Sequence, residues 1–189
     1  MKKHIITIGG LPGSGKSTVK RLLAEKLGYT TFSTGDFVRQ MAFERNMTLE
    51  EFNELVKHDK TLDVLIDERL ERIEASEDCY IIDSHLAFHF VPSAFSVFLG
   101  ISPEQSAERI FNDAQSPTRI KSGDVMLTLE DAYKRTQKRI QNHLERYATH
   151  YGINPYIETQ YTLVIDTNEK SPALVADIIY EEYSAWIAE

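Results

Sequence analysis

The part of the sequence best suited to chemistry is a loop that begins at Gly10 and ends at Ser17. It reads Gly-Leu-Pro-Gly-Ser-Gly-Lys-Ser and matches the phosphate-binding pattern G-x-x-x-x-G-K-[ST] at every fixed position. The glycines let successive backbone N–H groups turn inward, and the helix that follows adds partial positive charge. The residues expected to hold a nucleoside triphosphate are Gly10, Gly13, Ser14, Gly15, Lys16, Ser17 and Thr18.

Two side chains of this loop have separate tasks in such a site. Lys16 would reach the β- and γ-phosphates, and the Ser17 hydroxyl would bind Mg²⁺. Asp83 ends a short apolar run, where P-loop proteins place a carboxylate near Mg²⁺, often through a water molecule. Two alternatives remain, since the loop could be a glycine-rich turn that binds nothing and Asp83 could cap a helix or a turn.

Arginines supply a second signal, because phosphoryl transfer needs positive charge near the oxygens of the migrating group. Arg135, Arg139 and Arg146 occur at i, i+4 and i+11, roughly on one face of a helix. A solvated charge stripe would have the same pattern. The preceding segment, 113–127, has the composition of a mobile loop and contains Arg119. A loop followed by an arginine-bearing helix suits a lid that excludes water, with Arg139 as the strongest catalytic candidate.

Polar residues after the next expected strand could bind a second substrate, the acceptor. Arg39 would face the acceptor's phosphate, and the Thr34 hydroxyl and the Gly35 backbone would shape the pocket beside Asp36. The alternative is that Arg39 only pairs with Asp36 or Glu44.

The histidines and the single cysteine give weaker signals. His85 and His89 are four residues apart, as in a helical metal pair, but no third ligand lies nearby in the sequence. Ordinary polar or core histidines are therefore the better interpretation. Cys79 excludes an internal disulfide, and its apolar setting predicts a buried strand residue.

The elements that must position these residues alternate between strands and helices. Strands are expected at 4–8, 29–33, 79–83, 95–101 and 161–166. Helices are expected at 16–27, 34–45, 61–75, 103–112, 128–150 and 172–186. One more helix should follow a capping box at Thr48 and Glu51. In the helix 61–75, periodicity predicts that Leu62, Leu65, Ile66, Leu70 and Ile73 face inward and that Asp63, Asp67, Arg69 and Arg72 face outward.

Short apolar strands that alternate with helices indicate a parallel sheet covered on both faces. The sequence therefore predicts an α/β fold, a three-layer P-loop NTPase sandwich with a five-stranded parallel sheet, in one domain over 1–189. Right-handed crossovers place the ligand site at the carboxyl ends of the strands. The phosphate loop, residues 33–36 and residues 83–85 should meet there.

Bulk properties narrow the function class. The 189 residues suffice for one domain and are few for two. A net charge of −8 argues against a nucleic-acid polymer as partner. The sequence has no signal-peptide pattern and no apolar run of about 18 residues, so a cytoplasmic enzyme without membrane association is expected. The oligomeric state stays open, and a monomer is compatible with the sequence.

Taken together, these features resemble the nucleoside monophosphate kinases, and most closely the short archaeal-type cytidylate kinases. The similar stretches recur in family order over nearly the whole chain and are Gly10–Thr18, Phe32–Arg39, Met47–Phe52, Asp63–Arg69, Arg146–Tyr147 with Tyr151–Ile153, and Tyr161–Thr167.

The resemblance implies ATP as phosphoryl donor, Mg²⁺, and a small-molecule pyrimidine monophosphate, CMP or dCMP, as acceptor. It implies acceptor-binding helices over 34–75 and a helical lid over 113–138. By position, Thr34 and Arg39 fall in the acceptor site, and Arg109 falls where related kinases place an arginine against the donor base. Arg139 and Arg146 match positions at which the family has arginines on the lid side.

The sequence departs from this family at two positions. His85 stands where the family usually has an arginine that contacts the acceptor, so His85 is assigned to the acceptor site. Asn112 and Asp113 stand where a second lid arginine is usual, and Arg119 is a candidate to supply that charge. Two other functions therefore stay open: a P-loop kinase for another nucleotide or a small metabolite, and a weakly active ATP-binding regulatory module.

Overall fold

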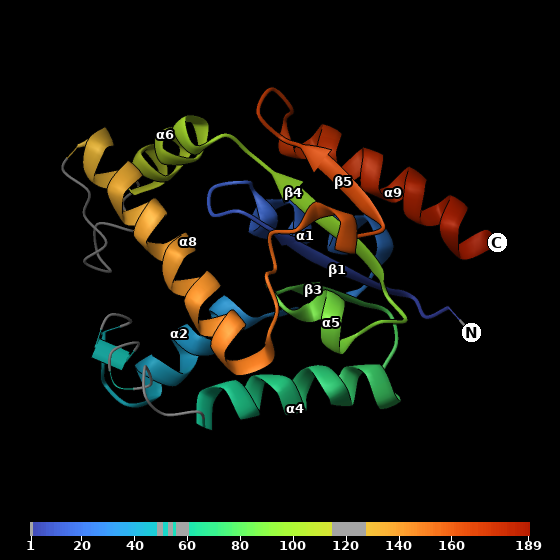
Figure 1. Cartoon of the computed structure of the whole chain (residues 1–189). Coiled ribbons are helices and arrows are strands. Elements are labelled where there is room, and N and C mark those ends of the chain that lie inside the picture. Colours follow the sequence, from blue (N-terminus) through green and yellow to red (C-terminus); the bar gives the residue numbers. More distant parts are fainter. Residues whose placement is uncertain (1, 49–50, 53–54, 56–60, 115–127) are drawn as a thin grey trace.

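A five-stranded parallel sheet forms the centre of the molecule (Figure 1). The computed structural model describes residues 2–48, 51–52, 55, 61–114 and 128–189. The strand order is β2-β3-β1-β4-β5. The strand bounds are Ile5–Gly10 for β1, Thr30–Ser33 for β2, Tyr80–Asp83 for β3, Phe95–Gly100 for β4 and Leu163–Asp166 for β5.

Alternating side chains of β1 supply the hydrophobic core on both faces of the sheet. Ile6 and Ile8 join one cluster, with residues of helices α1 (Lys16–Leu27) and α9 (Pro172–Ala188). Ile5 joins a second cluster, with residues of α4 (Thr61–Ser76) and the short α5 (Ala87–Phe90). All six residues of β1 are buried, as expected for the central strand of a three-layer sandwich.

The remaining helices lie toward the carboxyl ends of the strands (Figure 1). Helix α2 spans Thr34–Glu44, α6 spans Pro103–Ala114 and α8 spans Leu129–Tyr151. Helices α6 and α8 pack side by side. A short 3-10 turn, η1 (Glu158–Gln160), precedes β5. Among the described helices, none has the length and apolar character that crossing a membrane requires.

Most of the expected elements are confirmed. The five strands and their parallel pairing are present, and α1 has its predicted bounds, with Gly28 at its end in the left-handed conformation (φ 70°). The capping box is also present, because Thr48 N–H donates to a Glu51 carboxylate oxygen (2.8 Å) and Glu51 N–H donates to Thr48 Oγ1 (3.2 Å). The expected loop at 113–127 begins later, since α6 includes Asp113 and Ala114. Residues 115–127 lie outside the described part of the chain.

Three predictions about burial are wrong. Cys79 is exposed and precedes β3, in a left-handed turn with φ 59°. The ladder begins only at the next residue, where Tyr80 N–H donates to His4 O (3.1 Å). On α4, Asp63 is buried although periodicity places it outside, while Leu65 is 37% exposed. Asp63 is buried because its carboxylate pairs with Arg146 of α8, a contact that periodicity within α4 cannot anticipate.

Thr128, the residue directly before α8, provides a test of how the start of this helix is stabilised. Thr128 Oγ1 accepts a hydrogen bond from Asp131 N–H (3.1 Å), so Thr128→Ala should lower the free energy of unfolding by about 1 kcal/mol. Urea denaturation measures the change. Thr149→Ala, at an exposed position of the same helix, is the control and should be neutral or slightly stabilising. Equal losses in both variants would contradict the capping role.

Candidate active site

At two positions the phosphate loop has a backbone conformation, and too little space for a Cβ, so that only glycine fits. Gly10 has φ 134°, and a Cβ there would lie 2.3 Å from Leu99 O. Gly13 has φ 76°, and its Cβ would lie 2.9 Å from Ser106 O. Both glycines therefore serve the turn itself. The Ser106 hydroxyl, on α6, donates to Pro12 O (2.7 Å) and ties the loop to that helix. Sequence reasoning missed Ser106, because no motif or spacing near Ser106 in the sequence indicates its contact with the loop.

Lys16 lies along the inside of the loop. Its Nζ donates to Gly10 O (3.0 Å) and Leu11 O (2.7 Å). Burial lowers the pKa of Lys16 to about 8; the nearby Asp83 carboxylate opposes this shift, and the Arg139 guanidinium adds to it. The ammonium group is therefore held in place by neutral carbonyl groups, which an incoming anion can replace.

Ser17 and Asp83 come together at the carboxyl ends of the strands, as the sequence predicts. Ser17 Oγ donates to Asp83 Oδ2 (3.2 Å), and Asp83 is buried. The Thr34 hydroxyl donates to the main-chain oxygen of Asp83 (3.5 Å), so the start of α2 reaches the same place. A hydroxyl and a carboxylate are hard oxygen ligands of the kind that Mg²⁺ prefers. The residues present fit this cation.

The expected acceptor residues form an ion-pair network at the start of α2. Lys20, which is buried, contacts Asp36 Oδ2 (3.1 Å), and Arg39 Nη2 contacts Asp36 Oδ1 (2.6 Å). Burial alone would raise the pKa of Asp36, but hydrogen bonds from Arg39 and Lys20 outweigh this effect and lower the pKa. Arg39 thus makes the pairing with Asp36 that the sequence left open. Gly35 lies beside it, since a Cβ there would be 3.5 Å from the guanidinium group.

The arginines of α8 have different surroundings. Arg139 is exposed and makes no hydrogen bond or ion pair with another described residue. It lies close enough to the phosphate loop for its charge to act on the pKa of Lys16. Arg146 instead forms an ion pair with Asp63 of α4. The catalytic roles of both remain predictions, and Arg119 lies outside the described residues.

His85 is enclosed by aromatic rings that sequence reasoning did not assign to the site. Its ring centroid lies 4.5 Å from that of His143, 5.8 Å from Tyr156 and 6.2 Å from Tyr147. His143 Nδ1 in turn lies 2.8 Å from Tyr156 Oη. Because Arg139, His143 and Tyr147 follow at intervals of four residues on α8, this spacing is the signal that could have found them.

The surroundings of His85 keep its imidazole uncharged. Burial, followed by the nearby His143, Lys16 and Arg139, lowers its pKa well below the ordinary value. Its Nδ1 is buried and has no hydrogen-bond partner within the part of the chain that the structure describes. Among the described residues, neither His85 nor His89 belongs to a group of three metal-ligating side chains, and the ring of His89 packs against Phe90.

Arg109 lies on α6 and holds the segment between β5 and α9. It donates to Thr167 O (2.6 Å) and Asn168 O (3.0 Å). These bonds fix the guanidinium plane at the edge of the sheet next to α6. Its contact with a donor base remains a prediction.

Comparison with known proteins places this chain in a family. A family profile described as an AAA domain matches residues 6–145. A cytidylate kinase from Methanocella arvoryzae is 34% identical over 177 residues, which cover 94% of this chain and 95% of that protein. The chain belongs to the family of P-loop kinases that includes the archaeal cytidylate kinases.

A second relative of this kinase is longer. The S-adenosylmethionine-dependent nucleotide dehydratase of Lacinutrix mariniflava is 36% identical over 182 residues, which cover 96% of this chain and 36% of that protein. The chain therefore spans about a third of that relative. A shikimate kinase from Acinetobacter baumannii, solved with shikimate, has the same fold, with a TM-score of 0.61 and 17% identity over 98% of this chain and 94% of that one.

The partly buried imidazole of His143 should make the stability of the kinase depend on pH. Burial, followed by the charges of Arg139, Lys16 and Arg146, lowers its pKa to about 3. Between pH 6.5 and 3 the unfolded chain therefore binds a proton at this residue that the folded chain does not. Stability should fall with decreasing pH in this window, by about 1.4 kcal/mol per pH unit for this proton, and level off below it.

Urea denaturation between pH 4.5 and 7.5 measures this dependence. In His143→Asn the slope should be smaller than in the wild type by about that amount. His89→Asn, at an exposed position, is the control and should keep the wild-type slope. An unchanged slope in His143→Asn would show that His143 takes up its proton in the folded protein.

Proposed function

We propose that the protein transfers the γ-phosphoryl group of ATP to CMP or dCMP, with Mg²⁺. Two findings support this proposal. The cytidylate kinase from Methanocella arvoryzae resembles the chain over 94% of its length. Lys16, Ser17 and Asp83 also meet at one edge of the sheet, with the Ser17–Asp83 hydrogen bond (3.2 Å) as the observation that carries the assignment.

The donor would bind along the phosphate loop. Backbone N–H groups and the start of α1 would hold its phosphates, and Lys16 would exchange its loop carbonyls for β- and γ-phosphate oxygens. Ser17 would bind Mg²⁺, with Asp83 directly or through water. When bound, Mg²⁺ neutralises charge that develops on the phosphate oxygens.

The acceptor needs no general base, because its attacking atom is already a phosphate oxygen. Catalysis would then consist of positioning and electrostatic stabilisation. Arg139 suits electrostatic stabilisation, since it has no partner among the described residues and its charge lowers the pKa of Lys16. Thr34 and Arg39 would position the acceptor near the end of β2, where Asp36 fixes the orientation of Arg39.

One observation favours a second candidate function, a kinase for a different nucleotide or a small metabolite. The lowered pKa of His85 keeps its imidazole uncharged, whereas the family resemblance implies a cationic arginine at this position. An acceptor bound beside it would meet a neutral hydrogen-bonding ring rather than a positive charge.

The roles of Lys16 and Arg139 can be tested by truncation. Lys16→Ala and Arg139→Ala should each lower kcat by about 100-fold or more, since each removes a charge that stabilises the transition state. Thermal unfolding should show that both variants stay folded. Lys138→Ala, at the neighbouring exposed position on α8, is the control and should keep most of the activity. Wild-type rates in both active-site variants would refute their assigned roles.

The identity of the acceptor is decided by a coupled assay with ATP and Mg²⁺. CMP and dCMP should be phosphorylated with higher kcat/KM than UMP, AMP or a set of small alcohols. Transfer to non-nucleotide acceptors alone would support the second candidate function and exclude the first. ATP binding without transfer to any acceptor would favour a regulatory module.

A further inference from the structure

A largely buried ion pair joins two helices, α4 and α8. Asp63 lies near the start of α4, and Arg146 lies near the end of α8. The Asp63 carboxylate accepts hydrogen bonds from Nη2 and from Nε of Arg146, the latter at 3.3 Å. His150 Nδ1 lies 3.7 Å from the same carboxylate. Asp63 is only 8% exposed, so water screens this pair less than it would a surface pair.

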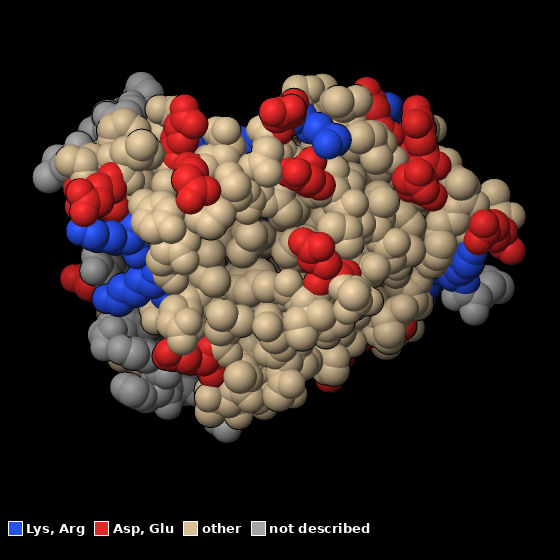
Figure 2. Space-filling model, turned by 45° about the horizontal axis from the view of Figure 1, so that its top comes forward, with Lys and Arg blue, Asp and Glu red and all other residues tan. Residues whose placement is uncertain are grey.

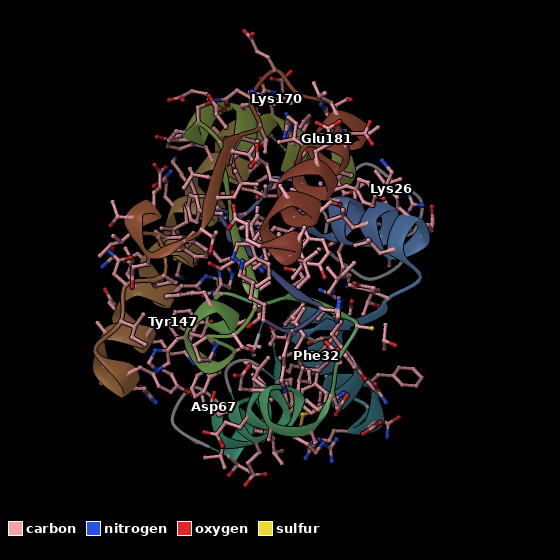
Figure 3. All side chains as sticks on the ribbon, turned by 90° about the vertical axis from the view of Figure 1, so that its right-hand side faces the viewer. Lys26, Phe32, Asp67, Tyr147, Lys170 and Glu181 are labelled. Atoms are coloured by element: carbon pink, nitrogen blue, oxygen red, sulfur yellow. The ribbon has the colours of Figure 1, made fainter. Side chains whose placement is uncertain are left out.

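A second contact links the same helices one turn farther along. Tyr151 Oη donates to Asp67 Oδ2 (2.7 Å). Figure 1 shows the end of α8 beside the start of α4, and Figure 3 labels Asp67 on α4 and Tyr147 on α8. Two carboxylates on one face of α4 thus hold the C-terminal part of α8. Helix α8 cannot rotate about its axis without breaking both contacts.

The rotation of α8 decides where Arg139 lies. Arg139 and Arg146 are seven residues apart, which is close to two helical turns and about 10 Å along the axis. They therefore project from nearly the same side of the helix. With Arg146 fixed on Asp63, Arg139 lies near enough to the phosphate loop for its charge to lower the pKa values of Lys16 and His85.

The two arginines have different tasks in this arrangement. Arg146 uses two of its N–H groups on Asp63, whereas Arg139 has no partner among the described residues. Arg139 is therefore the cation available to a phosphate. We propose that Asp63 is a positioning residue: by holding Arg146, it fixes α8 on α4 and so fixes where Arg139 lies relative to the phosphate loop. This inference rests on the proposed phosphoryl transfer and adds to it a residue outside the reacting groups.

Kinetics of Asp63→Asn, Arg146→Gln and the double variant test this role. Each single variant should lower kcat by about 10- to 100-fold, because a guanidinium displaced by about 1 Å loses much of its effect. The KM for ATP should change less than twofold, since the phosphate loop is untouched. The double variant should be no slower than the slower single variant, because both remove the same link.

Two further variants sharpen this test. Asp63→Glu keeps the charge and should recover part of the lost activity. Glu68→Gln, at an exposed position of α4, is the matched control and should behave as the wild type. If Arg146 itself contacts the phosphates, Arg146→Gln will be far slower than Asp63→Asn. That result, or a wild-type kcat in Asp63→Asn, would overturn the proposal.

Hydrogen–deuterium exchange of the protein without nucleotide provides a readout that does not need the reaction. Amides of α8 should exchange faster in Asp63→Asn than in the wild type or Glu68→Gln, while amides of β1 and β4 should exchange as before. Unchanged exchange in α8 would overturn the proposal even in an active enzyme. If the wild type phosphorylates no acceptor, the proposed function fails, and this experiment still decides whether Asp63 holds α8.

Discussion

The site depends on the parallel pairing of β1 with β3. In this register Ile8 lies opposite Asp83, so the carboxylate emerges beside the loop that continues from β1. The hydrogen bond from Ser17 to Asp83 follows from that placement. A slip of one residue would turn the Asp83 side chain to the other face of the sheet. The hydrophobic residues that fix the register, among them Ile6 and Ile82, therefore also fix the geometry of the proposed cation site.

The sequence predicted most of the fold and the centre of the site, because those features have local causes. The conformation of the phosphate loop follows from glycines at required positions, and α1 follows from apolar spacing with Gly28 at its end. Five short runs, most of them apolar, predicted the five strands. The meeting of Ser17 with Asp83 could also be predicted, since parallel strands bring their carboxyl ends to one edge.

The rest depends on contacts between distant parts of the chain. Asp63 looked like a surface residue because periodicity within α4 contains no information about Arg146 on α8. The pairing of Arg39 with Asp36 was one of several options that only the folded helix decides. Cys79 was expected in a strand because its neighbours are apolar, but the turn before β3 places it in a left-handed conformation. The packing of His143 on His85 likewise joins segments that are far apart in sequence.

The charge distribution has a consequence for how ligands arrive. The protein carries a net charge of −8, and on the face that Figure 2 shows, acidic side chains are spread widely while basic ones lie in small groups. Nucleotides are anions as well, so the long-range field of the molecule slows their approach. Attraction begins only within about a Debye length of Lys16 and its neighbours. Added salt should therefore speed the encounter while weakening the bound state, the reverse of what electrostatic steering gives.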